Sequence, residues 1–306
     1  MKTCRAFAPA TVANVAVGFD LMGFALEKIG DIVELSKNSA AGSVRITALV
    51  GDSAIPRDPK LNTATVGILA LLKDTRADFG LDVNIVKGIP IGSGLGGSAA
   101  SAVAGVFGAN AFLKKKLSAA ELFHYAMLGE KLASGSSHPD NIAPCLLGGF
   151  IYTHSMDPFE YYKIDLPRDL FAVVVHQNVR VDTKHARGIL KADLPLKAFV
   201  DQNRMLTGFL IGAFKKDVKL LGRSLQDLVI EPQRSKLIPH FDQIKSSALG
   251  SGALACSISG SGPSVFALVQ GKTKAARVLK AMMAAVNSKD ARGLISPISR
   301  KGARLL

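Results

Sequence analysis

The stretch IPIGSGLGGSAAS, residues 89–101, restricts how this chain can fold more than any other feature. It joins the alternating run LDVNIVKG to the small-residue run SAASAVAGVFGANAFL, which occupies residues 98–113. Alternation predicts a β-strand, and the second run predicts a buried helix because it is too short to span a membrane. The chain therefore carries a glycine loop between a strand and a helix, where backbone amides and the helix dipole favour an anion.

Two familiar phosphate-binding loops fit this stretch poorly. Gly92, Gly94 and Gly97 match the GxGxxG pattern of dinucleotide sites, but the residues about 20 positions on predict a helix and a loop instead of a strand ending in a carboxylate. A Walker loop needs Lys and then Ser or Thr after its last glycine, whereas Gly97 is followed by Ser98 and Ala99. Without that lysine a metal ion must neutralise more of the phosphate charge, with the Ser98 hydroxyl and a carboxylate as ligands. The structural alternative is a tight turn in which Ser98 only caps the helix.

Length and composition indicate an ordinary folded protein. The 306 residues are 48% apolar and 20% charged, which excludes disordered and fibrous classes. Because single cores stop growing at about 250–300 residues, two domains are expected.

Local patterns predict strands and helices that do not strictly alternate. A helix should begin at an Asn62 cap and end near Gly80, and Ser118 with Glu121 has the spacing of a capping box. Further helices are expected near 196–215 and 273–286. Strands are expected at 2–9, 31–37, 42–50, 81–88, 146–155 and 171–177, and a pair of strands is expected within 255–269. This mixture favours an α+β architecture.

The cysteines indicate the cellular compartment, and the net charge indicates which partners the protein can bind. Cys4, Cys145 and Cys256 are far apart and lack metal-like spacing, which fits a reducing cytoplasm. Asn14 and Asp20 interrupt any signal-peptide core, so the N-terminus reads as mature protein. The formal net charge of +14 favours anionic partners, but basic residues are scattered and only four Tyr and no Trp could stack on bases. We expect no nucleic-acid and no membrane partner, although a non-catalytic anion-binding or RNA-binding protein stays open.

Three motifs together resemble one family. The loop at 89–101 is similar to the central motif of the GHMP small-molecule kinases, and FAPATVANVAVGFDLMG at 7–23 and ISGSGPSVFALV at 258–269 resemble the other two motifs of that family. The resemblance implies a two-domain α+β fold, with a ribosomal protein S5 domain 2-like domain over 1–165 and a ferredoxin-like domain over 166–306. The chain has Gly97 where many members have serine, which removes a hydroxyl and keeps the amide.

The resemblance also implies a nucleotide site with ATP and Mg²⁺ as cofactors. Adenine would lie near Asn62, and Mg²⁺ would be held by Ser98 and Glu130, since hard cations take oxygen ligands. Without the family context, Glu130 would read as an exposed helix carboxylate paired with a lysine. The implied ATP-binding residues are Pro90, Ile91, Gly92, Ser93, Gly94, Leu95, Gly96, Gly97, Ser98, Ala99, Ala100 and Ser101.

Within the family, the first motif and the stretches at 136–141, 179–187 and 230–234 look most like the homoserine kinase branch. The implied acceptor is L-homoserine, phosphorylated in threonine biosynthesis, with a homodimer as the expected assembly. Another GHMP kinase, such as a mevalonate-type enzyme, stays open.

The acceptor pocket implied by that branch needs opposite charges for a zwitterion. Arg187 and Arg234 would bind the carboxylate, since a guanidinium fork suits a planar anion. Without the family context, Arg187 and Arg234 would be surface cations. Asp20 would be a turn residue, and His138 would be a polar residue of a loop. The remaining implied residues are Asn14, Asp20 and Asp140 for the ammonium and hydroxyl, His138 and Thr183 along the pocket, and Gly260, which shapes it.

The catalytic group is the least determined feature. Galactokinase and mevalonate kinase place an aspartate near the acceptor hydroxyl, and the comparable position here is Asn141, which cannot accept a proton as a carboxylate would. The implied chemistry is direct attack by an oriented hydroxyl, with the loop amides, the helix dipole and Mg²⁺ stabilising the transferred group. Asp140 as a general base is the open alternative.

Overall fold

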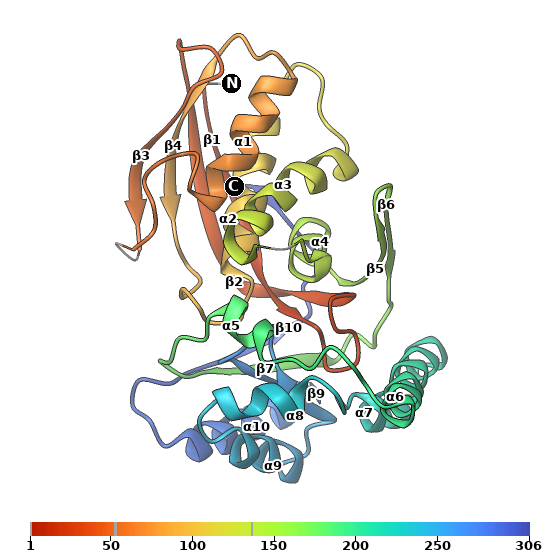
Figure 1. Ribbon diagram of the computed structural model, residues 1–306. Helices are drawn as coiled ribbons and strands as arrows, with labels where there is room; N and C mark the ends of the chain where they lie inside the picture. The colour runs from red at the N-terminus through yellow and green to blue at the C-terminus, as the bar shows by residue number, and fades with distance from the viewer. Residues whose placement is uncertain (1, 52–53, 136) are drawn as a thin grey trace.

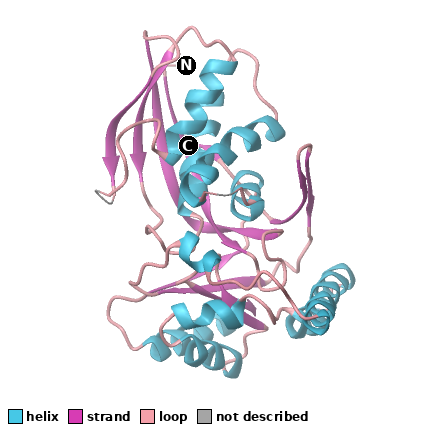
Figure 2. Cartoon of the chain, in the orientation of Figure 1, coloured by secondary structure: helices cyan, strands magenta, loops and turns pink. Residues whose placement is uncertain are grey.

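A computed structural model describes residues 2–51, 54–135 and 137–306. Ser136, the first residue of the 136–141 stretch, lies outside the described residues. Each of two β-sheets is covered by helices, one above the other in Figure 1, and Figure 2 shows helices and strands mixed in both halves. The α+β class is confirmed.

The first half is built on a sheet of seven strands in the order β11-β1-β2-β4-β3, with β5 paired to β2 and β6 paired to β5. Within the described part of this sheet, only β3 and β4 pair in parallel. The long β2 joins the whole sheet, because one end pairs with β4 and the other with β5. The strands are β1 Thr3–Ala13, β2 Met22–Asn38, β3 Val44–Val50, β4 Gly80–Val86, β5 Phe150–Met156, β6 Phe159–Lys163 and β11 Arg304–Leu305.

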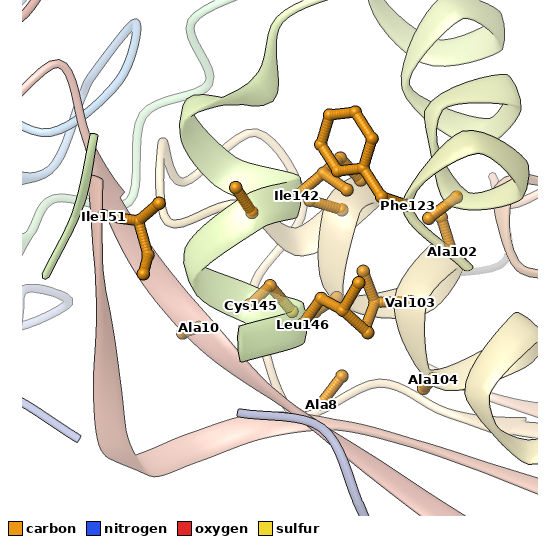
Figure 3. Packing of buried hydrophobic residues seen from close by; sticks show 14 of the residues in the cluster. Ala8, Ala10, Ala102, Val103, Ala104, Phe123, Ile142, Cys145, Leu146 and Ile151 are labelled. Atoms are coloured by element: carbon orange, nitrogen blue, oxygen red, sulfur yellow. The ribbon is translucent and has the colours of Figure 1, made fainter. Parts of the chain in front are cut away.

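Four helices of the described residues pack on this sheet and bury apolar side chains against it: α1 Thr63–Asp74, α2 Gly97–Asn110, α3 Ala119–Ser134 and α4 Pro139–Leu147. The predicted caps are confirmed, since Asn62 accepts from the Ala64 amide and Ser118 forms a capping box with Glu121. In Figure 3, small residues of α2 such as Ala102 and Ala104 let the helices and strands approach closely around Val103. The close packing follows from the Ala and Gly content of α2.

The predicted end of α1 near Gly80 is wrong, because the helix ends at Asp74. The Thr75 hydroxyl donates to the Leu71 carbonyl and Arg76 takes a left-handed conformation, with φ of 49°, which stops the helix. Gly80 instead starts β4, where a Cβ would lie 2.3 Å from the Ala40 carbonyl oxygen.

The second half contains a four-stranded antiparallel sheet in the order β10-β7-β9-β8. Numbered within this half, that order is 4-1-3-2, with helices following the first and third strands as in the ferredoxin-like arrangement. The strands are β7 Leu170–His176, β8 Ala255–Ile258, β9 Val265–Gln270 and β10 Arg292–Pro297. The helices are α5 Thr183–Gly188, α6 Leu196–Lys215, α7 Val218–Ser224, α8 Glu231–Arg234, α9 Phe241–Gly250 and α10 Lys272–Val286, with a 3₁₀ turn at Ser235–Leu237.

One apolar cluster extends from the first half into the second, and another lies within the second half. Along β7, Val173 and Val175 face the cluster under α9 and α10, while Ala172 and Val174 belong to the cluster of the first half. The C-terminal β11 returns to pair with β1 of the first sheet. We propose that the boundary between the two domains lies at residue 165, between β6 and β7. No helix of the described residues is both long and apolar enough to span a bilayer.

Candidate active site

A cavity of about 330 Å³ lies where the two halves meet. Its walls come from the glycine loop, the start of α1, the end of α3 and two segments of the second half, 180–183 and 260–261. Of the predicted nucleotide residues, Leu95 and Ala100 are buried in the core, and they and Pro90 do not line the cavity. The predicted residues that line it are Asn62, Ile91, Gly92, Ser93, Gly94, Gly96, Gly97, Ser98, Ala99, Ser101, Glu130, Asn141, Thr183 and Gly260.

The loop conformation requires its glycines. Gly94 has φ of +74°, and a Cβ there would lie 2.5 Å from the Ser259 carbonyl oxygen. Gly96 has φ of +67°, and a Cβ there would lie 2.1 Å from the Thr11 hydroxyl. The Ser259 hydroxyl also donates to the Gly94 carbonyl at 2.7 Å. The third sequence motif therefore lies against the loop.

Ser98 does not cap α2, so the structural alternative for this residue is wrong. The N-cap is Gly96, which has no side chain to cap the helix, and α2 begins at Gly97. The first amides of α2 thus lack a side-chain partner, and the helix dipole supports an anion at this end. Ser93 adds a buried hydroxyl on the cavity wall that has no hydrogen-bond partner within the described residues.

A lysine missed from the sequence lies beneath the loop. Lys87 follows β4, forms an ion pair with the fully buried Asp31, and donates to the Gly97 carbonyl at 2.9 Å and the Ser101 hydroxyl at 2.8 Å. Asp31 also accepts from the Gly88 amide at 3.0 Å. Lys87 therefore fixes the loop from β4, and Asp31 already compensates its charge.

Arg180 is a second missed cation on the cavity wall. Its side chain lies over the loop, since a Cβ on Gly92 would meet Arg180 Cγ at 2.7 Å. It is exposed, lines the cavity, and makes no ion pair within the part of the chain that the structure describes. The short stretch VRVD gave no pattern that would have assigned it a role.

Glu130 reaches the cavity from the last turns of α3 and is 8% exposed, so its alternative as an exposed carboxylate paired with a lysine is wrong. Burial, together with the negative Asp20, raises the pKa of Glu130 to about 7. The nearest ring nitrogen, His138 Nδ1, is 4.0 Å away, and burial lowers the pKa of that imidazole. A buried carboxylate without a close cation, facing the same cavity as Ser98, fits a hard divalent ion.

The described residues contain no group of three or more His, Cys, Asp or Glu side chains able to hold a metal on their own. This agrees with a Mg²⁺ site completed by phosphate oxygens, for which one or two protein ligands suffice.

Beside the cavity lies a group of opposite charges. Both oxygens of Asp20 accept from Arg187 Nη2, at 2.6 and 2.7 Å, although the two residues are 167 positions apart. Arg187 Nε is buried without a partner in the described part of the chain. Both Arg187 and Arg234 lie over the Phe19 ring, 5.1 and 5.2 Å from its centroid. Asp20 therefore does more than form a turn.

Arg234 is a buried side chain, 3% exposed, and not a surface cation. Its Nε donates to the Ala186 carbonyl at 3.0 Å and its Nη1 to the Gly260 carbonyl at 3.2 Å. Gly260 also accepts from Asn14 Nδ2 at 2.9 Å, and Asn14 Oδ1 accepts from the Asp20 amide at 3.1 Å. Since Gly260 lines the cavity, these contacts join the charged group to the nucleotide side.

His138 and Thr183 also lie at this junction. His138 Nε2 is 3.9 Å from Asp20 Oδ2, so this side chain lies between Asp20 and Glu130 instead of standing alone in a loop. The Thr183 hydroxyl is 3.4 Å from that of Ser261.

Asn141 and Asp140 begin α4 at the boundary of the two regions. The Thr11 hydroxyl donates to Asn141 Oδ1 at 2.6 Å, which leaves Asn141 Nδ2 as a donor, 3.5 Å from Asp140 Oδ1. Burial first, then the charges of Asp20 and Glu130, raise the pKa of Asp140 to about 8. In the free protein at neutral pH, Asp140 is therefore largely protonated and a poor base.

Asn62 lines the cavity, and both polar atoms of its side chain already form a hydrogen bond within the protein. Its Oδ1 caps α1 and its Nδ2 donates to the Pro56 carbonyl at 2.7 Å. One Nδ2 hydrogen is left for a ligand, and the neighbours Leu61 and Thr63 also line the cavity.

Residues 62–149 match the GHMP kinases N terminal domain, and residues 210–289 match the GHMP kinases C terminal domain. A homoserine kinase of Chlorobium phaeobacteroides is 42% identical over 321 aligned residues that cover both chains completely. The chain belongs to the GHMP kinase family.

Solved structures agree with this assignment. The crystal structure of homoserine kinase from Cytophaga hutchinsonii superposes with a TM-score of 0.96 at 42% identity, covering 100% of this chain and 98% of that one. Mevalonate kinase of L. major superposes with a TM-score of 0.71 over 95% of both chains, but at 16% identity it shows the fold alone. The family fold and a kinase activity on a hydroxyl acceptor are thus established for this GHMP kinase.

Proposed function

We propose that this GHMP kinase transfers the γ-phosphoryl group of ATP to the side-chain hydroxyl of L-homoserine, giving O-phospho-L-homoserine and ADP, a step of threonine biosynthesis. The observation that carries the proposal is the Asp20–Arg187 pair beside the cavity. A site that presents both a carboxylate and guanidinium groups suits a zwitterion. The full-length similarity to homoserine kinases supports this choice of acceptor.

Acceptor binding would exchange partners within the charged group. The amino acid offers an ammonium to Asp20 and a carboxylate to Arg187, so the internal pair is replaced by two intermolecular pairs. Arg187 Nε, which is buried without a partner in the described chain, gains an acceptor in this exchange. Leaving such a buried donor unpaired costs about 1–3 kcal/mol, so satisfying it favours the bound state. Arg234, held by Ala186 and Gly260, would provide a second, fixed guanidinium.

ATP would bind along residues 90–101, with adenine near Asn62 and the phosphates at the start of α2. Ser98 and Glu130 would hold Mg²⁺, which would supply positive charge to neutralise the phosphates. The buried ion pair of Lys87 and Asp31 would keep the loop in its binding conformation before the nucleotide arrives. Arg180 is then the cation available to meet charge that develops on the transferred group.

In the reaction, the homoserine oxygen would form a bond to the γ-phosphorus while the bond from that phosphorus to the bridging oxygen of ADP breaks. The hydroxyl proton passes to an oxygen of the transferred phosphoryl group, since Asn141 cannot accept it and Asp140 is largely protonated before substrate binds. Thr11 occupies Asn141 Oδ1, so Asn141, which lines the cavity, would contact the reactants as a donor through its Nδ2. Catalysis would rest on positioning and charge stabilisation, as is general for phosphoryl transfer.

The proposal also covers the cellular setting and the assembly. The three cysteines are all unpaired, which favours a reducing cytoplasm. We propose a homodimer with small-molecule substrates, and neither nucleic acid nor membrane as a partner.

The proposal is tested by identifying the product and the required groups of the acceptor. Incubation with ATP, Mg²⁺ and L-homoserine should give a phosphate monoester on the side-chain oxygen by ³¹P and ¹H NMR. 4-Hydroxybutyrate, which lacks the amine, and 3-aminopropanol, which lacks the carboxylate, should each react at least 100-fold more slowly. Equal rates with 4-hydroxybutyrate would refute the role of Asp20, and no product from any of them would refute the proposed reaction.

A further inference from the structure

Helix α6 has two apolar faces, and only one of them is covered. On the covered face, Phe209 is fully buried and its ring lies 5.4 Å from that of Phe150, while Gly212 lies close to Leu221 of α7. On the other face, Phe214 is 88% exposed and Leu196 is 76% exposed. Figure 1 shows α6 and α7 at the periphery of the second half. We call the exposed set the α6 face: Leu196, Phe199, Val200, Leu210, Ile211 and Phe214.

The spacing of the α6 face is symmetric about residue 205. Positions 196 and 214 lie nine residues to either side of 205, positions 199 and 211 lie six, and positions 200 and 210 lie five. Two exposed polar residues, Asn203 and Thr207, lie two residues to either side. The pattern repeats at three- and four-residue steps, so these side chains share one stripe of the helix.

The symmetric spacing indicates that a second copy of the chain covers the α6 face. In an interface with two-fold symmetry, residue i meets residue j and residue j meets residue i. Two α6 helices packed antiparallel with their midpoints at residue 205 would place Phe214 on Leu196, Ile211 on Phe199 and Leu210 on Val200 of the other copy. Asn203 would meet Thr207, so each polar pair could hydrogen-bond at the centre. A groove of an unrelated partner imposes no such mirror spacing.

The size of the α6 face is sufficient for a stable dimer. Aromatic side chains present ~150–250 Å², so with two phenylalanines and four aliphatic residues the face exposes roughly 600 Å². That value is at the upper end of the ~300–600 Å² found for the largest apolar patch of a monomer. Covering the face on two copies removes about 1,200 Å² before any polar rim is counted, which reaches the ~1,200–2,000 Å² of specific interfaces.

We infer that the protein forms a two-fold symmetric homodimer through antiparallel packing of α6 against α6. The inference locates the interface of the proposed dimer and does not depend on which acceptor the enzyme uses. No residue of α6 lines the active-site cavity, so both sites stay open in the dimer.

The test compares the oligomeric state of the wild type with two matched variants by sedimentation equilibrium. F214D places a charge in the α6 face, and Y162D makes the same kind of change at another exposed aromatic, on β6, the edge strand beside β5. We expect a dimeric wild type, a dimeric Y162D, and an F214D protein whose dissociation constant rises at least 100-fold while its melting temperature as a monomer is kept. A monomeric wild type at 50 μM, or dissociation caused by Y162D and not by F214D, would overturn the inference.

The register is tested by co-expressing two chains, one carrying N203C and the other T207C. Oxidation should cross-link the mixed pair, whereas N203C or T207C chains alone should cross-link far less. Equal cross-linking of the single variants alone would exclude the antiparallel register centred on residue 205. Kinase activity of wild type with L-homoserine, measured in parallel, separates a failure of this inference from a failure of the proposed function.

Discussion

Replacing Asp140 by asparagine should stabilise the protein at neutral pH. The carboxyl has a pKa of about 8 in the folded protein, because it is buried and lies near Asp20 and Glu130, against 3.8 for the ordinary group. The folded state therefore binds a proton that the unfolded chain releases, and stability falls as pH rises from about 4 through about 8. At 1.36 kcal/mol per pH unit, Asp140 destabilises the folded protein by about 4 kcal/mol at pH 7. D140N keeps the shape of the side chain and removes this pH-dependent destabilisation.

The assay is thermal unfolding of the wild type and D140N from pH 4 to pH 8. The two melting temperatures should coincide near pH 4 and diverge as pH rises, with D140N higher by about 5–10 °C at pH 7. D82N is the control, because the Arg45 guanidinium lowers the pKa of Asp82, so this variant should show no gain. A difference that does not change with pH would refute a buried, protonated Asp140.

The same variant separates two roles of Asp140. If Asp140 binds the ammonium or hydroxyl of the acceptor, D140N raises KM for homoserine and leaves kcat within a few-fold. A fall of about 10²–10⁴-fold in kcat would instead identify it as the general base and contradict the mechanism.

Three further substitutions test the site. D20N should raise KM for homoserine at least tenfold in steady-state assays and leave KM for ATP unchanged, because it removes the ammonium partner. R180Q should lower kcat about 10²-fold with little change in KM for ATP. K184Q, on the neighbouring helix, should have a kcat near that of wild type. Equal effects of the two substitutions would show that Arg180 only attracts the anionic nucleotide nonspecifically. G94A should abolish the rise in melting temperature caused by ATP with Mg²⁺, because a Cβ would meet two carbonyl oxygens; G250A, which meets nothing within 4 Å, should keep it.

Much of the fold could be predicted because its signals are local. The caps at Asn62 and Ser118 depend on residues two or three positions away, and the continuous apolar run of β7 is typical of a strand packed on both faces. Helix α4 was not predicted, since Pro144 inside it and Pro139 at its start read as turn formers. Pro139 is tolerated because the first helical amides need no partner within the helix.

The structure brings most of the predicted site residues together, but the sequence did not indicate which of them contact one another. Asp20 and Arg187 were both named from motifs, but their pairing across 167 positions depends on how the two halves meet. The position of Lys87 does not match the Walker phosphate-loop pattern, because that pattern places its lysine after the last glycine. In this fold the lysine beside the loop comes from the end of the preceding strand, β4. Its partner Asp31 lies 56 positions away on β2, where no local pattern links the two residues.

The most direct test of the central claim is ADP release from ATP in the presence of Mg²⁺, compared for L-homoserine, R-mevalonate, galactose and no acceptor. We predict that L-homoserine stimulates ADP release at least 100-fold and that the other conditions stay at the background rate. Stimulation by mevalonate or galactose in place of homoserine would keep the phosphate loop and contradict the zwitterion pocket of Asp20, Arg187 and Arg234.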